Sequence, residues 1–209
     1  MRVSEKTLSE HAVSPVVGVM LMLVVVIIIA AVVSAFAGGL GIGAKKSPAA
    51  SIDVKINTAA DDTMGGTETI MTFTELSGDP IPTKDLAIVT YFKNANTGII
   101  YKNKQMATSA ATRLTSSTKT TRVPFLNDMR YGYSGNNPVK DFGNYTWSTG
   151  DVLSTGSTAG TAALLAINST TIPYTISNTT GFGPGSVVDV KILHVPSGQY
   201  LFDKEVVVQ

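Results

Sequence analysis

The sequence lacks cysteine altogether, contains two histidines and carries a formal net charge of only +1. A chain without cysteine has no disulfide, no thiolate metal site and no cysteine nucleophile. Charge-driven binding of nucleic acid needs a basic surface that neutralises phosphates, and a nearly neutral chain does not supply one. The composition therefore argues against a nucleic-acid partner, and any folded domain must be held together by its hydrophobic core alone.

Sequence motifs for catalysis and for metal binding are missing as well. Segment 132–135 misses the spacing of a nucleophile elbow by one residue. Segment 38–45 misses the phosphate-loop pattern by one residue, and the acidic pair Asp61 and Asp62 does not have the spacing of a calcium-binding EF-hand. His194 falls in a predicted strand, opposite the Val190 pattern or just after it, where a lone histidine is usually structural. We predict no enzyme activity, no catalytic residue, no metal site and no cofactor.

Charged residues are absent from one long stretch. No Asp, Glu, Lys, Arg or His occurs between Ala12 and Ala44, and residues 16–33 are mostly Val, Leu and Ile. A helix of about 20 such residues crosses the hydrocarbon core of a bilayer. Ser14 and Pro15 suit the first positions of this helix, because Ser caps a helix and Pro needs no hydrogen-bonding partner there. The apolar run is too long for an ordinary secretory signal peptide.

The apolar segment supports a family resemblance. Residues 12–39, with Ser14, Pro15 and Gly18 at the helix start, resemble the N-terminal segment of archaeal type IV pilins. Weaker similarity to the β-rich heads of that family continues over residues 72–86 and 190–198. The resemblance implies that a prepilin peptidase cuts between Ala12 and Val13. It also implies that an assembly ATPase and a membrane platform move the helices from lipid into a filament.

The predicted helix has features that favour packing against other helices. Small residues repeat at four-residue spacing in two adjacent rows, Ala30, Ser34 and Gly38 in one and Ala31, Ala35 and Gly39 in the other. Small residues let two backbones approach closely within a membrane. The glycines after them also allow a second interpretation, a loosened exit from the membrane, since each Gly weakens a helix by about 1 kcal/mol relative to Ala. We expect a leader at 1–12, a helix at 13–37 and a glycine-rich neck at 38–48.

The remaining residues, 49–209, have the pattern of an all-β head. Apolar side chains alternate with polar ones around Ile52, Leu86 and Val188, in short runs separated by Gly, Pro, Asn and Ser. This alternation is typical of an antiparallel β-sandwich, of the immunoglobulin type or a related one. Segments 186–195 and 200–208 read as a hairpin, and 161–167 is ambiguous and fits a helical turn. Segments 107–121 and 131–137 are predicted to be exposed connections.

The side of the membrane that carries the head is less clear from charge. Lys and Arg before the helix are balanced by Lys45 and Lys46 after it, so the positive-inside rule does not choose an orientation. Asn144, Asn168 and Asn178 each begin an N-glycosylation pattern, which is useful only outside the cytoplasm. They favour a head outside the cell on a single membrane-spanning helix.

Together these observations predict a type IV pilin-like structural subunit. We expect it to wait in the membrane, to self-associate into a cell-surface filament, and to serve adhesion or surface interaction. The alternative is a monomeric surface-binding protein that uses the same helix as a permanent anchor and never assembles.

Overall fold

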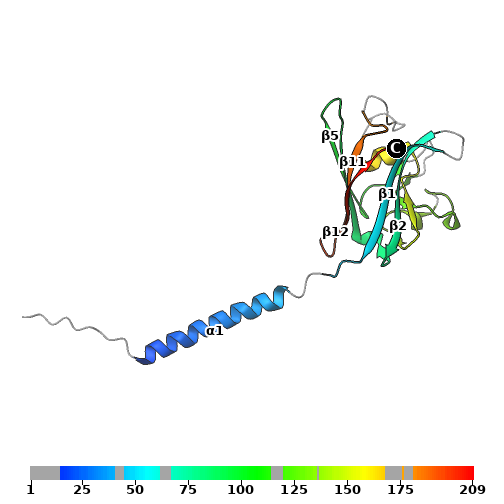
Figure 1. Ribbon diagram of the computed structural model, residues 1–209. Coiled ribbons are helices and arrows are strands. Elements are labelled where there is room, and N and C mark those ends of the chain that lie inside the picture. Colours follow the sequence, from blue (N-terminus) through cyan, green and yellow to red (C-terminus); the bar gives the residue numbers. More distant parts are fainter. Residues whose placement is uncertain are drawn as a thin grey trace, which may run out of the picture. The chain divides into compact units, whose positions relative to one another are not determined.

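The structure, a computed structural model, describes residues 15–40, 45–61, 67–113, 120–135, 137–167, 176 and 181–209. The chain divides into two compact units, residues 1–44 and 45–209. The first contains helix α1, Pro15–Leu40 (Figure 1). The second contains the strands, so the predicted helix followed by a mostly antiparallel β head is confirmed.

The head is built on two four-stranded antiparallel sheets. The first has the order β1-β2-β10-β8, with strands Ala50–Asp61, Thr67–Gly78, Val152–Ser154 and Phe125–Leu126. The second has the order β12-β11-β4-β5, with strands Gln199–Val207, Val187–His194, Leu86–Lys93 and Ile100–Met106. Two small pairs, β3 (Ile81–Pro82) with β9 (Thr146–Trp147) and β6 (Thr112–Arg113) with β7 (Thr120–Thr121), lie outside these sheets. Short 3₁₀ helices cover Thr83–Asp85, Met129–Tyr131 and Pro138–Lys140.

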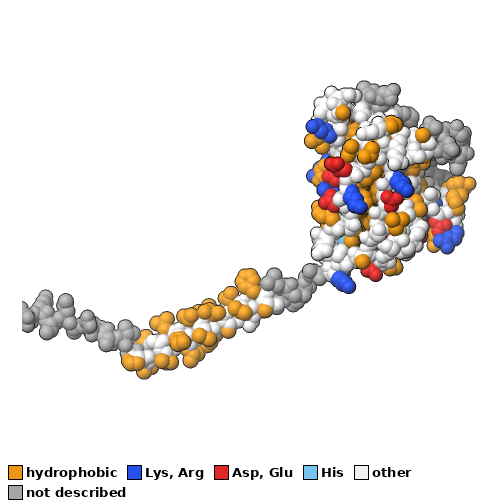
Figure 2. Space-filling model, in the orientation of Figure 1, with side chains coloured by type: hydrophobic (Ala, Val, Ile, Leu, Met, Phe, Trp, Pro, Cys, Tyr) orange, Lys and Arg blue, Asp and Glu red, His pale blue; other side chains and the backbone are white. Residues whose placement is uncertain are grey.

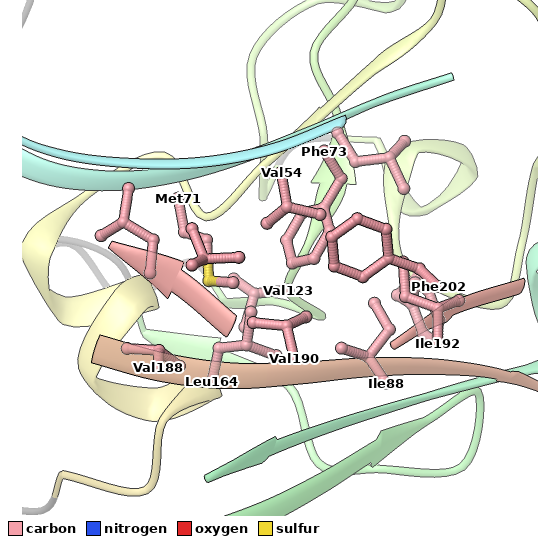
Figure 3. Packing of buried hydrophobic residues seen from close by; sticks show 14 of the residues in the cluster. Val54, Met71, Phe73, Ile88, Val123, Leu164, Val188, Val190, Ile192 and Phe202 are labelled. Carbon is pink, nitrogen blue, oxygen red and sulfur yellow. The ribbon is translucent and has the colours of Figure 1, made fainter. Parts of the chain in front are cut away.

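The hydrophobic core lies between the two sheets. Val54, Met71 and Phe73 from the first sheet point toward Ile88 and Val190 from the second (Figure 3). All five are buried, as period-two alternation on each strand requires. The faces predicted around Ile52, Leu86 and Val188 are therefore confirmed as core faces.

A short helix, α2 (Thr158–Leu164), covers one end of the core. Its N-cap is Ser157, whose side chain accepts a hydrogen bond from the Gly160 N–H at 3.2 Å. Beyond the end of β10, threonine hydroxyls accept the hydrogen bonds of β2 that a strand would otherwise accept. Thr155 Oγ1 accepts from the Met71 N–H, and Thr158 Oγ1 accepts from the Thr69 N–H, both at 2.9 Å. The ambiguous segment 161–167 thus falls on the end of a helix that starts three residues earlier.

The first and last strands join the two sheets along one edge. Ile56 and Val208 form a parallel bridge, and the Gln209 N–H donates to the Ile56 carbonyl at 2.9 Å. The predicted C-terminal hairpin is confirmed as β11 and β12, with a register shift between Ile192 and Leu193.

The chain enters the head through a tight contact at Ala49. The Ala49 N–H donates to Asp79 Oδ2 at 3.0 Å, and its carbonyl accepts from the Asp79 N–H at 2.8 Å. Gly78 has a positive φ of 147° beside this contact, and a Cβ there would collide with the Ala49 carbonyl. Only glycine fits this position without moving the backbone.

Two expectations from the sequence need correction. His194 shares the parity of Val190 and Ile192 and is buried with them, because the regular alternation of β11 continues to its last residue. Its Nδ1 lies 2.8 Å from Ser197 Oγ, which fits a structural side chain. Helix α1 also continues through Gly38 and Gly39 to Leu40, residues that the sequence assigned to the neck.

Candidate functional site

Helix α1 exposes apolar side chains on every side. All of its described side chains, residues 15–37, are exposed, and Figure 2 shows the apolar ones along the face in view. At 1.5 Å per residue, its 26 residues extend about 39 Å, more than the hydrocarbon thickness of a bilayer. A helix that is apolar on all sides would still expose apolar side chains to water if only one of its faces were covered. Its surroundings must therefore be lipid or other apolar helices.

The small residues form two neighbouring rows on this helix. Ala30, Ala31, Ser34 and Ala35 are described and exposed, and the rows continue to Gly38 and Gly39 within α1. Gly18 lies in the first half of the helix, where a Cβ would meet nothing within 4 Å. The geometry leaves these positions open for contact with a second helix. Whether another helix occupies them stays a prediction.

The residues predicted at the start of the helix lie partly outside the described structure. Pro15 is the first residue of α1. Ala12, Val13 and Ser14 lie outside the described residues, so the cleavage position and the Ser14 cap stay predictions.

One of the three glycosylation patterns is described. Asn144 is exposed, and its Nδ2 donates to the Pro138 carbonyl at 2.8 Å. The next residue, Tyr145, is buried and its hydroxyl donates to the Pro124 carbonyl at 3.0 Å. Asn168 and Asn178 lie outside the described residues. Glycosylation stays a prediction at all three positions.

The most perturbed acid in the head was not singled out by the sequence. Glu75 on β2 is fully buried, and neither oxygen of its carboxyl has a hydrogen-bond partner within the described part of the chain. Burial, followed by the nearby charges of Asp151 and Asp79, raises the pKa of this carboxyl to about 7. In the sequence Glu75 has the same parity as Met71 and Phe73, so the period-two alternation of β2 already places its side chain on the core face, and a carboxyl at such a position is the signal that could have found it. A register shift between Ser51 and Ile52 on β1 places Ile52 opposite it.

Metal binding finds no support in the described ranges. Among these residues, no group of three or more His, Cys, Asp or Glu is placed to hold a metal ion. The buried lysine Lys140 also has a structural environment, since its Nζ donates to the Gly132 carbonyl at 2.5 Å and lies 5.8 Å from the centre of the Phe125 ring. Burial lowers the pKa of Lys140. Neither observation gives the head a metal site, and the functional interpretation rests on α1.

Comparison with known proteins bears on the same segment. No curated protein and no solved structure gives a significant match. Residues 11–52, which include α1 and the first residues of β1, match the family described as archaeal type IV pilin, N-terminal. The match covers the apolar helix with its small-residue rows, and it ends where the head begins. The N-terminal segment of this chain is thus similar to the N-terminal domain of archaeal type IV pilins.

Proposed function

We propose that this protein is a type IV pilin-like structural subunit of a cell-surface filament, held in the membrane by α1 before assembly. The observation that carries the proposal is a helix exposed and apolar on all sides, within a segment that matches the pilin family. Such a helix is stable both in lipid and among copies of itself, and a filament subunit must occupy each of these environments in turn.

The proposed life cycle follows from the order of segments. A prepilin peptidase removes residues 1–12 and leaves Val13 as the first residue. An assembly ATPase with a membrane platform then moves α1 from the bilayer into the filament core. The helix contains no acidic residue, so neighbouring subunits take their register from the fit of the small-residue rows.

The head supplies the outer surface of this filament. Orientation of the head outside the cell is favoured by the exposed Asn144 pattern. Its two-sheet core gives a rigid support for exposed loops, which commonly carry binding. Adhesion or another surface interaction is the proposed role of the assembled filament.

The competing function is a monomeric surface-binding protein with α1 as a permanent anchor. A permanent anchor also requires apolar residues along α1, but it does not require small residues on any particular face of the helix. Enlarging a small residue distinguishes the two, because lipid tolerates extra methylenes whereas a packed core loses typically 1 to 3 kcal/mol per overfilled site.

The test is recovery of filaments from cells expressing the parent, Ala30→Leu, Ser34→Leu or both, with peptide mass mapping to identify the subunit. Ile29→Phe, which adds bulk on the face of the helix opposite the two small-residue rows, is the matched control. We expect filaments from the parent and the control, and a marked loss for the double variant with membrane insertion unchanged. Parent cells that carry this protein on their surface but build no filament containing it would favour the anchor.

A further inference from the structure

The sheet β12-β11-β4-β5 ends in two strands whose outer edges are not paired in any ladder formed by the described residues. Among the described residues, β5 pairs only with β4. On the opposite side, β12 lies beside β1, and the two chain segments are hydrogen-bonded where the Gln209 backbone, just after β12, meets Ile56 and Thr58. Because alternate residues of a strand direct their hydrogen-bonding groups to the same side, the backbone groups of Val207, Glu205 and Asp203 face the same edge as those of Gln209.

These outer groups of β12 are accessible. A groove of about 310 Å³ separates β12 from β1 and is lined by Asp53 and Lys55 on one side and by Glu205 and Val207 on the other. Asp203, Glu205 and Val207 are exposed. Among the described residues, the outer backbone groups of Asp203 and Glu205 have no backbone partner, and a strand that enters the groove between β12 and β1 would reach them.

The two edges carry opposite charges on the same face and in the same rows. The register places these residues side by side across the sheet: Asp203, Lys191, Val89 and Lys104 in one row, and Glu205, Asp189, Tyr91 and Lys102 in the next. Residues of the other parity, such as Val190 and Ile88, are buried in the core, so both rows lie on the outer face. One edge thus presents two carboxylates, of which Asp203 already accepts a hydrogen bond from Lys191 of its own head at 2.6 Å, and the other presents two ammonium groups.

A third row adds an apolar pair. Val207 follows Glu205 by two residues on β12, and Ile100 precedes Lys102 by two residues on β5. The side chains of both are exposed, at 54% for Val207 and 64% for Ile100. Three consecutive outer-face positions of one edge therefore complement three of the other: acid with base, acid with base, and apolar with apolar.

We propose that β12 of one head pairs with β5 of a second copy of this chain, so that the sheets of neighbouring heads join edge to edge in the filament. This inference rests on the proposed function. In that arrangement Glu205 lies opposite Lys102 of the next copy, and Asp203 lies opposite Lys104. Strand directions agree, because successive strands of a four-stranded antiparallel sheet alternate, and a translated copy brings β5 beside β12 in antiparallel orientation.

The charge pattern selects this contact over others. Pairing of β5 with β5, or of β12 with β12, places like charges opposite each other, which is unfavourable. A shift of one residue moves every side chain to the wrong face, and a shift of two leaves Lys102 opposite Val207. Lysines on an edge strand commonly serve to prevent pairing. Here the acidic edge of β12 in a second copy gives these lysines a partner. A contact between two different edges leaves one edge of each kind free at the ends, so further copies can be added, as a filament requires.

Charge reversal at one pair tests the contact. Glu205→Lys places a lysine opposite Asp189 within its own head, so the head keeps a favourable neighbour. Lys102→Glu loses only a contact with the Tyr91 ring, 5.1 Å away. We expect each single variant to reduce the yield of filaments severalfold at low salt, since the lost attraction becomes repulsion in every subunit. The double variant should restore assembly.

The restoration is informative because the two residues are far apart in one head. Three strand spacings of about 4.8 Å separate β12 from β5, so a salt bridge between positions 205 and 102 forms only between copies. Lys84→Glu lowers the net charge by the same amount as Lys102→Glu, at an exposed position outside β5 and β12, and is the control for that variant. Full assembly of both single variants, or failure of the double variant to recover, would overturn the contact.

A second readout uses the absence of cysteine. Glu205→Cys with Lys102→Cys in one chain gives two thiols that cannot bond within a head, because a disulfide needs Cα atoms within about 7 Å. Mild oxidation of purified filaments should yield a ladder of covalent oligomers on a non-reducing gel, whereas either single cysteine stops at dimers. Filaments without a ladder would refute the edge contact while leaving the proposed function intact. Absence of filaments from the parent chain would instead overturn the proposed function, and this inference with it.

Discussion

The buried carboxyl of Glu75 makes the stability of the head depend on pH. In the unfolded chain this group ionises near pH 4.5, whereas in the folded head its pKa is raised to about 7. Between these values the folded state holds a proton that the unfolded state has lost. The stabilisation is thus fully present below pH 4.5 and is lost as the pH rises through 7.

The size of this effect follows from the shift. A change of one pKa unit corresponds to about 1.4 kcal/mol, which sets an upper limit of about 3 kcal/mol for this carboxyl. The adjacent turn is exposed at Thr149 and Gly150, and the Gly150 N–H donates to the Glu75 carbonyl, so we expect solvent at this turn to reduce the effect to about 1 to 2 kcal/mol. Glu75→Gln keeps the shape of the side chain and removes the ionisation. Between pH 5 and pH 8, the free energy of unfolding should therefore fall by about 1 to 2 kcal/mol less in the variant than in the parent.

Denaturant unfolding of the full chain in detergent measures this difference. The single tryptophan of the sequence, Trp147, is fully buried in the head and its Nε1 donates to the Asp151 carbonyl at 3.2 Å, so its fluorescence reports on this region alone. Glu205→Gln, at an exposed carboxylate, is the control and should follow the parent. The reasoning is refuted if Glu75→Gln shows the same pH dependence as the parent, or if the parent is more stable at pH 8 than at pH 5.

Three further outcomes are expected. N-terminal sequencing of protein from membranes should give Val13 or an adjacent residue; an intact Met1 would contradict processing, and cleavage after Ala37 would indicate an ordinary signal peptide. A fragment covering residues 45–209, which form a separate compact unit, should be soluble and melt cooperatively with a strand-dominated circular dichroism spectrum; a mainly helical spectrum would be inconsistent with the two sheets. Phe73→Ala removes a fully buried ring from the core and should lower the free energy of unfolding by about 3 to 5 kcal/mol, whereas Tyr133→Ala, at an exposed ring, should change it by less than about 0.5 kcal/mol.

The parts of the fold that the sequence predicted are those where one physical term dominates. The uncharged stretch around α1 predicted an apolar helix, because a run of that length without charges is stable as a helix in lipid. Strict alternation around Ile52 and Val188 indicated the core faces, and Pro196 to Gln199 indicated the turn before β12. In each case the signal is local and no distant residue competes with it.

The parts that the sequence did not reveal depend on register between distant strands. Nothing near Glu75 in the chain indicates that Asp151 lies close to it or that its carboxyl has no hydrogen-bond partner among the described residues. The charged rows of β5 and β12 are likewise invisible until pairing through β4 and β11 aligns Lys102 with Glu205. Parity also misled the prediction for His194, because the end of a strand is the least certain feature of an alternating pattern.

The contact at Ala49 has a mechanical consequence. Any tension carried by the segment that precedes the head reaches the folded domain at this residue, where two hydrogen bonds to Asp79 are the first to bear it. Behind them, β1 and β2 are paired from Ala50 and Gly78 onward. A pull along β1 loads this ladder in shear, so its bonds resist together and do not open one after another. The domain is thereby attached to the segment before it through its longest pair of strands, which is what the proposed role as a filament subunit would require under load.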